Sequence, residues 1–124
     1  MILRWNDLWL PPMETLTPGA VAVIFISKRT AEDDAGYQAA AAEMEAEAAR
    51  QPGYLGLHSV RGADGEGITI SYWADEDAAI AWRRHAGHAT VREHGRARWY
   101  EYYHLIVAEV RRDHCWRRGA SPPD

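Results

Sequence analysis

The chain has 124 residues, enough for one hydrophobic core, and nothing in its length requires a second domain. Its apolar fraction of 47% and charged fraction of 26% are typical of a soluble globular protein. A net charge of −4, with arginines scattered among acids, argues against a nucleic-acid partner. The single cysteine, Cys115, permits no intramolecular disulfide and no run has the length of a membrane span, so a cytoplasmic location without membrane contact is expected.

Residues 1–19 are expected to form an N-terminal arm, because the segment ends in PPMETLTPG, whose prolines and glycine resist regular structure. The arm begins MILRWNDLWLPPM, which is too short and polar for a signal peptide. The folded domain is expected over residues 20–112, and a C-terminal tail over residues 113–124. A single domain between two extensions is therefore predicted.

The domain is predicted to start with a strand and a helix. Residues 20–28, AVAVIFISK, form a continuous apolar run that indicates a strand buried on both faces. Thr30 or Asp33 is expected to cap the following helix, and QPG to end it at Arg50. Apolar residues at i, i+4, i+7 and i+11 predict one helical stripe, made of Tyr37, Ala41, Met44 and Ala48.

A hairpin, a second helix and a last strand complete the predicted order. Segments 54–62 and 68–73 have the composition of strands, and the aspartate–glycine pair between them indicates a hairpin. Residues 75–94 predict a helix capped by Asp75, with Gly87 as a weak point. Residues 99–110, WYEYYHLIVAEV, predict the fourth strand.

The order β-α-β-β-α-β predicts an α+β, ferredoxin-like fold, with a four-stranded antiparallel sheet and both helices on one face. The first strand is nevertheless apolar on both faces, with Ala22, Ile24 and Ile26 on the side opposite Val21, Val23 and Phe25. Soluble monomers avoid exposing such an apolar sheet. A second copy of the chain, packed sheet against sheet, is therefore the expected partner.

The span from AVIFISKRT through GYQAAAAEMEAEAARQPGYLGLHSVR to GITISYWADEDAAIAWRRHAGH resembles the antibiotic biosynthesis monooxygenase superfamily of dimeric α+β barrels. The most telling pieces are QPGYLG after the first helix, SYW before an acidic helix start, and Trp82 nine residues beyond Trp73. The resemblance covers about residues 20–112 and implies the fold more strongly than an activity.

Two branches of this superfamily imply different chemistry. Cofactor-free members oxidise aromatic polyketide phenols with an asparagine, a tryptophan and sometimes a tyrosine, of which this chain offers Trp82 and nearby tyrosines. Its one asparagine, Asn6, lies in the arm. Haem-degrading members use a strand asparagine, a tryptophan matching Trp82 and a later axial histidine, where this chain has Arg92. An axial role would then require His85 and a shifted or shortened helix.

Trp82 and His85 are three residues apart and share a predicted helix face toward the sheet, while His88 lies nearer its edge. Because imidazole exchanges protons near neutral pH, a phenol could give its proton to His85 or His88, and the phenolate could reduce O₂ without a cofactor. Trp82, His85 and His88 are the candidate catalytic residues. The alternative is a core tryptophan beside a half-buried histidine.

Four further residues are candidates for binding the aromatic substrate: Tyr72, Trp73, Tyr37 and Arg29. Tyr72 and Trp73 must point to opposite faces of their strand, and alternation alone does not say which faces the helices. Most of the aromatic residues between Trp99 and His104 are expected at the dimer interface.

The sequence therefore predicts a monooxygenase without flavin or metal, acting on an aromatic or polycyclic molecule between sheet and helices. Two alternatives stay open: a haem-binding or haem-degrading protein with His85 on the iron, and a dimer that binds a small ligand without chemistry. Two histidines without a third ligand do not indicate zinc, and no hydrolase or kinase motif is present.

Overall fold

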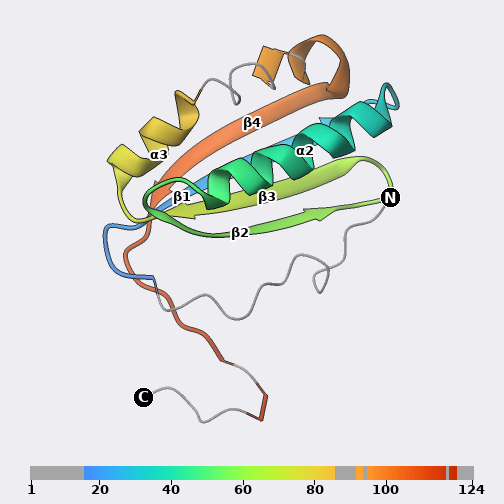
Figure 1. The fold of residues 1–124 in the computed structure, drawn as a ribbon. Helices are drawn as coiled ribbons and strands as arrows, with labels where there is room; N and C mark the ends of the chain where they lie inside the picture. Colours follow the sequence, from blue (N-terminus) through green and yellow to red (C-terminus); the bar gives the residue numbers. More distant parts are fainter. Residues whose placement is uncertain (1–15, 86–91, 94, 117, 120–124) are drawn as a thin grey trace.

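The computed structural model describes residues 16–85, 92–93, 95–116 and 118–119. One antiparallel sheet has the strand order β2-β3-β1-β4, and helices α2 and α3 lie on the same face of it (Figure 1). The predicted α+β, ferredoxin-like fold is confirmed. The elements in chain order are β1 (Val21–Arg29), α2 (Asp34–Ala49), β2 (Tyr54–Arg61), β3 (Glu66–Trp73), α3 (Glu76–Arg83), the π-helical turn η1 (Gly95–Trp99) and β4 (Tyr100–Glu109).

Strand register decides which side chains face the helices. Val21 lies opposite Trp73 of β3, and directly paired residues of antiparallel strands point to the same face. Alternate residues of β1 therefore face α2 and α3, among them Val23 and Phe25, while Ile24 faces the other way. The expectation that β1 is apolar on both faces is confirmed.

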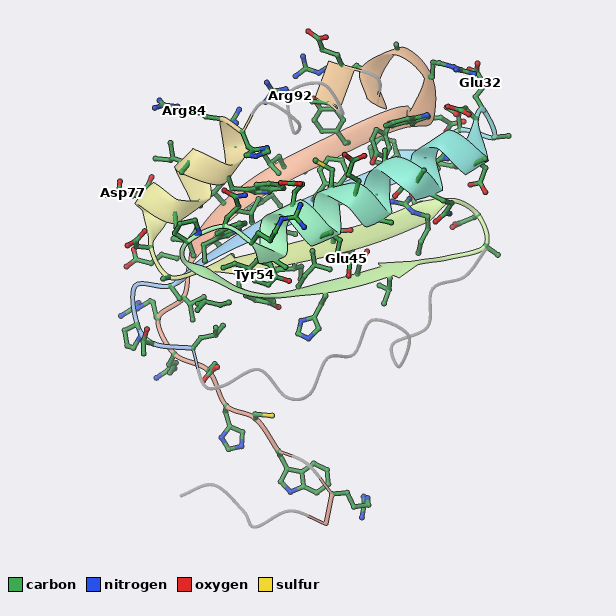
Figure 2. All side chains as sticks on the ribbon, in the orientation of Figure 1. Glu32, Glu45, Tyr54, Asp77, Arg84 and Arg92 are labelled. Atoms are coloured by element: carbon green, nitrogen blue, oxygen red, sulfur yellow. The ribbon has the colours of Figure 1, made fainter. Side chains whose placement is uncertain are left out.

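Trp73 is the centre of the core between sheet and helices. Its side chain is completely buried, and its indole Nε1 donates a hydrogen bond of 2.9 Å to Ser71 Oγ, so the one polar atom of the ring is satisfied. Trp82 of α3 stacks on Trp73 with ring centroids 5.9 Å apart, and Tyr54 meets it edge-on at 5.7 Å. Tyr54 lies at the start of β2, near the C-terminal end of α2 (Figure 2).

Helix α2 begins and ends as the sequence predicts. Asp33 is the cap, with a left-handed backbone (φ 50°) and a carboxylate that accepts from Gly36 N. The loop after the helix turns at Gly53, where φ is +84° and an added Cβ would lie 2.6 Å from the Cβ of Ala78. Glycine at this position therefore lets the loop before β2 approach α3.

Helix α3 is shorter than predicted. Asp75 caps it as expected, accepting from Ala78 N at 2.8 Å, but the helix ends at Arg83. Residues 86–91 and 94 of the predicted helix lie outside the described residues. The His85 amide donates to the Trp82 carbonyl three residues earlier, a tightening typical of a helix end. Ala79 and Trp82 are the buried residues of α3, and the next three residues are exposed or half-buried. Without further burial, nothing in the described segment extends the helix.

The sheet face opposite the helices carries apolar side chains from all four strands. Register places them in adjacent rows, and Ile68, at 41% exposure, is one of the more open. The apolar residues on this open face are Ala22, Ile24, Ile26, Val60, Ile68, Ile70, Ile106 and Ala108. Of these residues Ala22 is buried and Ile68 is exposed, and the others are half-buried.

The two extensions meet beside β1. Leu16 N donates to the Asp113 carboxylate at 2.8 Å, and Gly19 N donates to Val110 O at 3.1 Å. The first fifteen residues of the expected arm lie outside the described residues. Among the helices that are described, none has the length and apolar character needed to cross a membrane.

Replacing Trp73 with alanine is expected to lower the free energy of unfolding by about 3–5 kcal/mol, because it opens a cavity under both helices. Urea unfolding at a fixed protein concentration measures the loss. Trp116→Ala is the control, since Trp116 is 59% exposed and its removal is expected to change stability little. Equal losses in the two variants would contradict this account of the core.

Candidate active site

Trp82 and His85 form one group on the helix side of the sheet, as their spacing predicts. Their rings are 5.4 Å apart and tilted by 32°, and Trp82 in turn stacks on Trp73 at 24°. Trp82 is buried, whereas the His85 side chain is 33% exposed. The structure thus joins three of the predicted residues into an aromatic row that ends in an imidazole.

A carboxylate that sequence reasoning missed lies beside this imidazole. Glu47 of α2 places Oε2 3.8 Å from His85 Nε2, and its other oxygen, Oε1, accepts from the Arg50 guanidinium. The second imidazole nitrogen, Nδ1, is buried and has no hydrogen-bond partner in the described structure. Glu47 lies three residues after Met44 and just before Ala48, at the edge of the predicted apolar stripe, and that position was the available signal.

No metal centre is formed by the described residues, which contain no group of three metal-ligating side chains. Haem would need an imidazole nitrogen that iron can reach. His85 Nε2 faces a carboxylate and Nδ1 is buried, so the observed arrangement does not present His85 as an axial ligand. The mechanism below therefore uses no haem.

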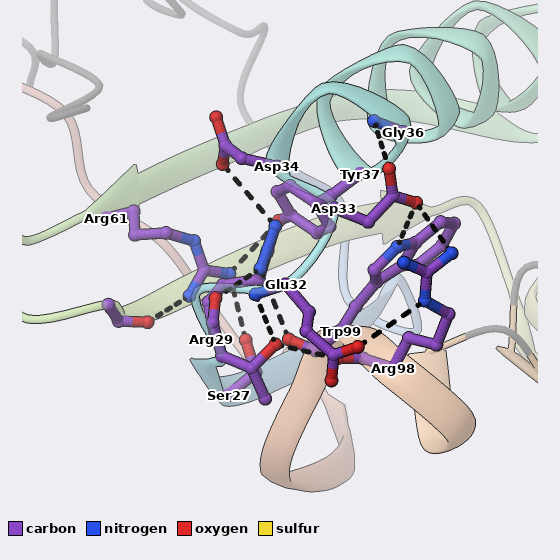
Figure 3. A network of polar contacts seen from close by, with 12 residues as sticks. Ser27, Arg29, Glu32, Asp33, Asp34, Gly36, Tyr37, Arg61, Arg98 and Trp99 are labelled. Atoms are coloured by element: carbon purple, nitrogen blue, oxygen red, sulfur yellow. Dashed lines mark hydrogen bonds and ion pairs between the residues drawn. The ribbon is translucent and has the colours of Figure 1, made fainter.

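Arg29 and Tyr37, two predicted substrate-binding residues, meet at the other end of the helix face. The Arg29 guanidinium lies 3.7 Å above the Tyr37 ring, and Arg61 of β2 approaches the same ring at 5.6 Å (Figure 3). Arg61 also donates to the hydroxyls of Ser27, at 2.9 Å, and Tyr37, at 3.2 Å. The aromatic row lies beside Val21, the partner of Trp73 in register, and the arginine group lies beside Ser27. The two groups are therefore six residues apart along β1, about 20 Å.

The expectation that most aromatic residues from Trp99 to His104 face the open side is wrong. Trp99 is buried and donates to Asp33 at 3.1 Å, and the rings of Tyr100 and Tyr103 contact Phe25 on the helix side. The register shifts where β4 passes Arg29, which leaves an extra residue and breaks the alternation. Three of the five side chains therefore belong to the helix face.

Tyr100 is held as a neutral phenol. Burial raises the pKa of Tyr100 far above its usual value, the charge of Tyr37 and a hydrogen bond with it raise it further, and Arg61 and Arg29 lower it. Burial has the larger effect, so the hydroxyl keeps its proton.

Tyr72 lies on the opposite side of the sheet from Trp73, which settles the choice that alternation left open. Its hydroxyl is 3.0 Å from His58 Nδ1, and burial raises the pKa of Tyr72 and lowers that of His58. Tyr72 therefore faces the open side, away from Trp82. His88 lies outside the described residues.

The helix side is incompletely covered over β4. Leu105 and Val107 pair with Phe25 and Val23, so they face the helices, yet they are 37% and 53% exposed. A hollow of about 270 Å³ opens at the end of this strip, and none of the predicted site residues lines it. Its lining consists of Gly19, Val21, Glu76, Val107 and Glu109.

A family model described as antibiotic biosynthesis monooxygenase matches residues 20–94, more than half of the chain. The chain belongs to the antibiotic biosynthesis monooxygenase family. The resemblance seen in the sequence is confirmed. Within this family the chain is 45% identical over 108 residues to the uncharacterized protein YqjZ of Bacillus subtilis (strain 168), an alignment that covers 87% of this chain and 94% of YqjZ.

Solved structures of the antibiotic biosynthesis monooxygenase fold superimpose on the chain. SnoaB of Streptomyces nogalater, described as a cofactor-independent oxygenase, gives a TM-score of 0.65 at 21% identity, covering 77% of this chain and 96% of its own. Rv0793 of Mycobacterium tuberculosis gives 0.64 at 16% identity, covering 72% and 92%. At these identities the likeness shows the shared fold.

The raised pKa of Tyr100 predicts a loss of stability in alkali. Above about pH 10 an unfolded tyrosine releases its proton while folded Tyr100 keeps it, so the unfolded state is favoured as pH rises. Urea unfolding at pH 9 and pH 11 measures the change, and Tyr100→Phe is expected to make it smaller. An equal pH dependence in wild type and variant would contradict the assignment.

Proposed function

We propose that this chain is a monooxygenase that oxidises an aromatic or polycyclic phenol with O₂ on the helix side of the sheet, without flavin or metal. The observation that carries the proposal is His85, whose imidazole lies against Trp82 and beside Glu47 and keeps one nitrogen free of hydrogen bonds. Membership of the antibiotic biosynthesis monooxygenase family supports the same class of reaction.

The chemistry requires a group that accepts a proton. A phenol hydroxyl gives its proton to His85, and the electron-rich phenolate then transfers electrons to O₂. One oxygen atom enters the ring at a C–H carbon and the other leaves as water, so phenol and O₂ give quinone and water without an outside reductant. The protein's part is to deprotonate, orient and shield the substrate.

Glu47 and the tryptophans position this reaction. The Glu47 carboxylate lies 3.8 Å from Nε2 and helps to fix the orientation of the imidazole ring. Nδ1 has no hydrogen-bond partner in the described structure, and we assign it as the nitrogen that accepts the phenol proton; because it is buried, the His85 side chain must rearrange before a phenol, like haem iron, can reach it. A buried nitrogen without a partner costs free energy, which a ligand hydroxyl would recover. Trp82 and Trp73 supply flat apolar surface beside it.

His85→Gln is expected to lower kcat about 10²–10⁴-fold, because glutamine cannot accept a proton from the phenol. Glu47→Gln is expected to lower kcat about fivefold, since only a partly exposed charge pair is lost. Oxygen uptake with a panel of polycyclic phenols and anthrones measures both. His114→Gln, an exposed histidine in the tail, is the control and is expected to match wild type.

Three outcomes would contradict all or part of this proposal. Absence of oxygen uptake across the whole panel, with ligands still bound, would make the chain a binding protein. A Soret band on adding haem that disappears in His85→Gln would assign His85 to iron instead. Uptake that persists unchanged in His85→Gln would remove the histidine from the mechanism.

We also propose that a second copy of the chain covers the open sheet face. The apolar rows there are continuous across four strands, and they include few charges, so a two-fold related copy can bury them. At one end of the open face, Lys28 of β1 pairs in register with Glu66 of β3. This end of the face therefore carries one positive and one negative charge. A copy of the same surface is therefore electrostatically compatible.

Light scattering after gel filtration is expected to give twice the chain mass of 14.0 kDa for the wild type. Ile68→Lys is expected to give a folded monomer, because it places a charge in the middle of the open face. Ile80→Lys is the matched control: Ile80 is 39% exposed but lies on α3, and its variant is expected to stay dimeric. A monomeric wild type at micromolar concentration would refute the dimer.

A further inference from the structure

We propose that Arg29, Arg61 and Tyr37 form a subsite for a carboxylate group of the ligand, at the end of the helix face remote from His85. This inference rests on the proposed function in one respect, namely that the rest of the ligand lies on the helix face. It narrows the proposed substrates from aromatic molecules in general to aromatic acids. The subsite itself is built from the ends of β1 and β2 and the first turn of α2 (Figure 3).

Arg29 supplies a buried charge with a free donor. Its side chain is only 5% exposed, and one terminal nitrogen, Nη1, donates to the carbonyls of Thr30, at 2.8 Å, and Trp99, at 3.3 Å. The other, Nη2, reaches Asp34 at 3.4 Å, and that carboxylate is 70% exposed. The Nε atom is buried and has no partner in the described structure. A buried donor of this kind costs free energy until an acceptor reaches it.

Arg61 crosses the sheet to reach the same place. It projects from β2 over β3, where Gly67 is its partner in register, and donates to Ser27 of β1 and to the Gly65 carbonyl. A Cβ on Gly67 would lie 2.8 Å from the Arg61 guanidinium carbon, so glycine leaves the space that this side chain occupies. No carboxylate pairs with Arg61 in the segments that the structure describes.

The neighbouring groups do not neutralise these two cations. Asp33 accepts from Gly36 and Trp99 and lies 3.7 Å from Arg98, and Glu32 also pairs with Arg98. Tyr100 stays protonated, as described above. Among the described residues, the exposed Asp34 is therefore the one carboxylate paired with either Arg29 or Arg61, which leaves an excess positive charge in a partly desolvated place.

A planar carboxylate matches the excess positive charge of Arg29 and Arg61 better than a neutral group does. Guanidinium donors are arranged in a fork that matches two carboxylate oxygens, and Tyr37 offers a hydroxyl and a ring face beside them. The side chains between this subsite and the aromatic row are half-buried rather than packed away, among them Phe25, Ser59 and Thr69. An aromatic acid bound with its charge at the arginine end would have to lie against these side chains, of which Phe25 contacts Tyr100 and Tyr103 and Ser59 is hydrogen-bonded to Thr69.

The test compares 2-naphthoate with 2-naphthamide, which differ in charge but hardly in shape. Isothermal titration of the full chain at low salt is expected to show naphthoate binding at least about tenfold more tightly. Arg61→Gln is expected to remove that preference and to leave naphthamide binding unchanged. Gly67→Ala is expected to weaken naphthoate selectively, because it displaces the Arg61 guanidinium. Arg83→Gln is the charge-matched control, because Arg83 is an exposed residue of α3. This variant is expected to keep the preference for naphthoate over naphthamide.

A readout at the atom level accompanies the titration. In ¹⁵N NMR spectra, the Arg29 Nε–H signal is identified as the arginine signal that is missing in Arg29→Lys. This signal is expected to shift when naphthoate is added and to stay in place when naphthamide is added. Circular dichroism of each variant checks that it folds. The proposal would be overturned if the wild type bound the two ligands equally, or if it did not bind naphthoate at millimolar concentration. It would also be overturned if folded Arg61→Gln lost binding of both ligands.

His85→Gln separates this inference from the proposed activity. The variant is expected to keep the preference for naphthoate while losing oxygen uptake. A preference that persists in a wild type without oxygenase activity would leave the carboxylate subsite standing and overturn the oxygenase proposal alone.

Discussion

The structure depends on β1 being apolar on both faces, one of which packs under the helices. Its helix-facing residues pack under α2 and α3 around Trp73, and its other residues form the middle of the open face. This alternation affects more than stability, because it also decides which polar side chains at the strand ends face the helices. Arg29 and Ser27 lie on the helix side for the same reason that Val21 does.

Much of this could be predicted from the sequence. The order of strands and helices along the chain, both helix caps and the pairing of Trp82 with His85 follow from local periodicity and capping residues, which act over a few positions. Glu47 could not be assigned to His85, because the two lie on different helices and only packing brings them together. Arg61 was missed for a similar reason: its route over Gly67 depends on strand register.

Two local errors have local causes. The length of α3 was overestimated because helix propensity continues beyond Trp82, whereas the next three residues, 83–85, are exposed or half-buried. The prediction that most aromatic residues from Trp99 to His104 lie at the interface was wrong. One extra residue in β4, Glu101, turns Tyr100 to the helix side, and a bulge of this kind leaves no clear mark in the sequence.

The Gly65 carbonyl has a consequence for the hairpin between β2 and β3. This single oxygen accepts from the backbone of Arg29 and from the side chain of Arg61, so the tip of the hairpin joins the ends of two other segments. Surface turns usually tolerate inserted residues. Here an insertion would move the shared acceptor away from both donors, so this short turn is a poor place for grafting loops and a sensitive one for the positions of Arg29 and Arg61.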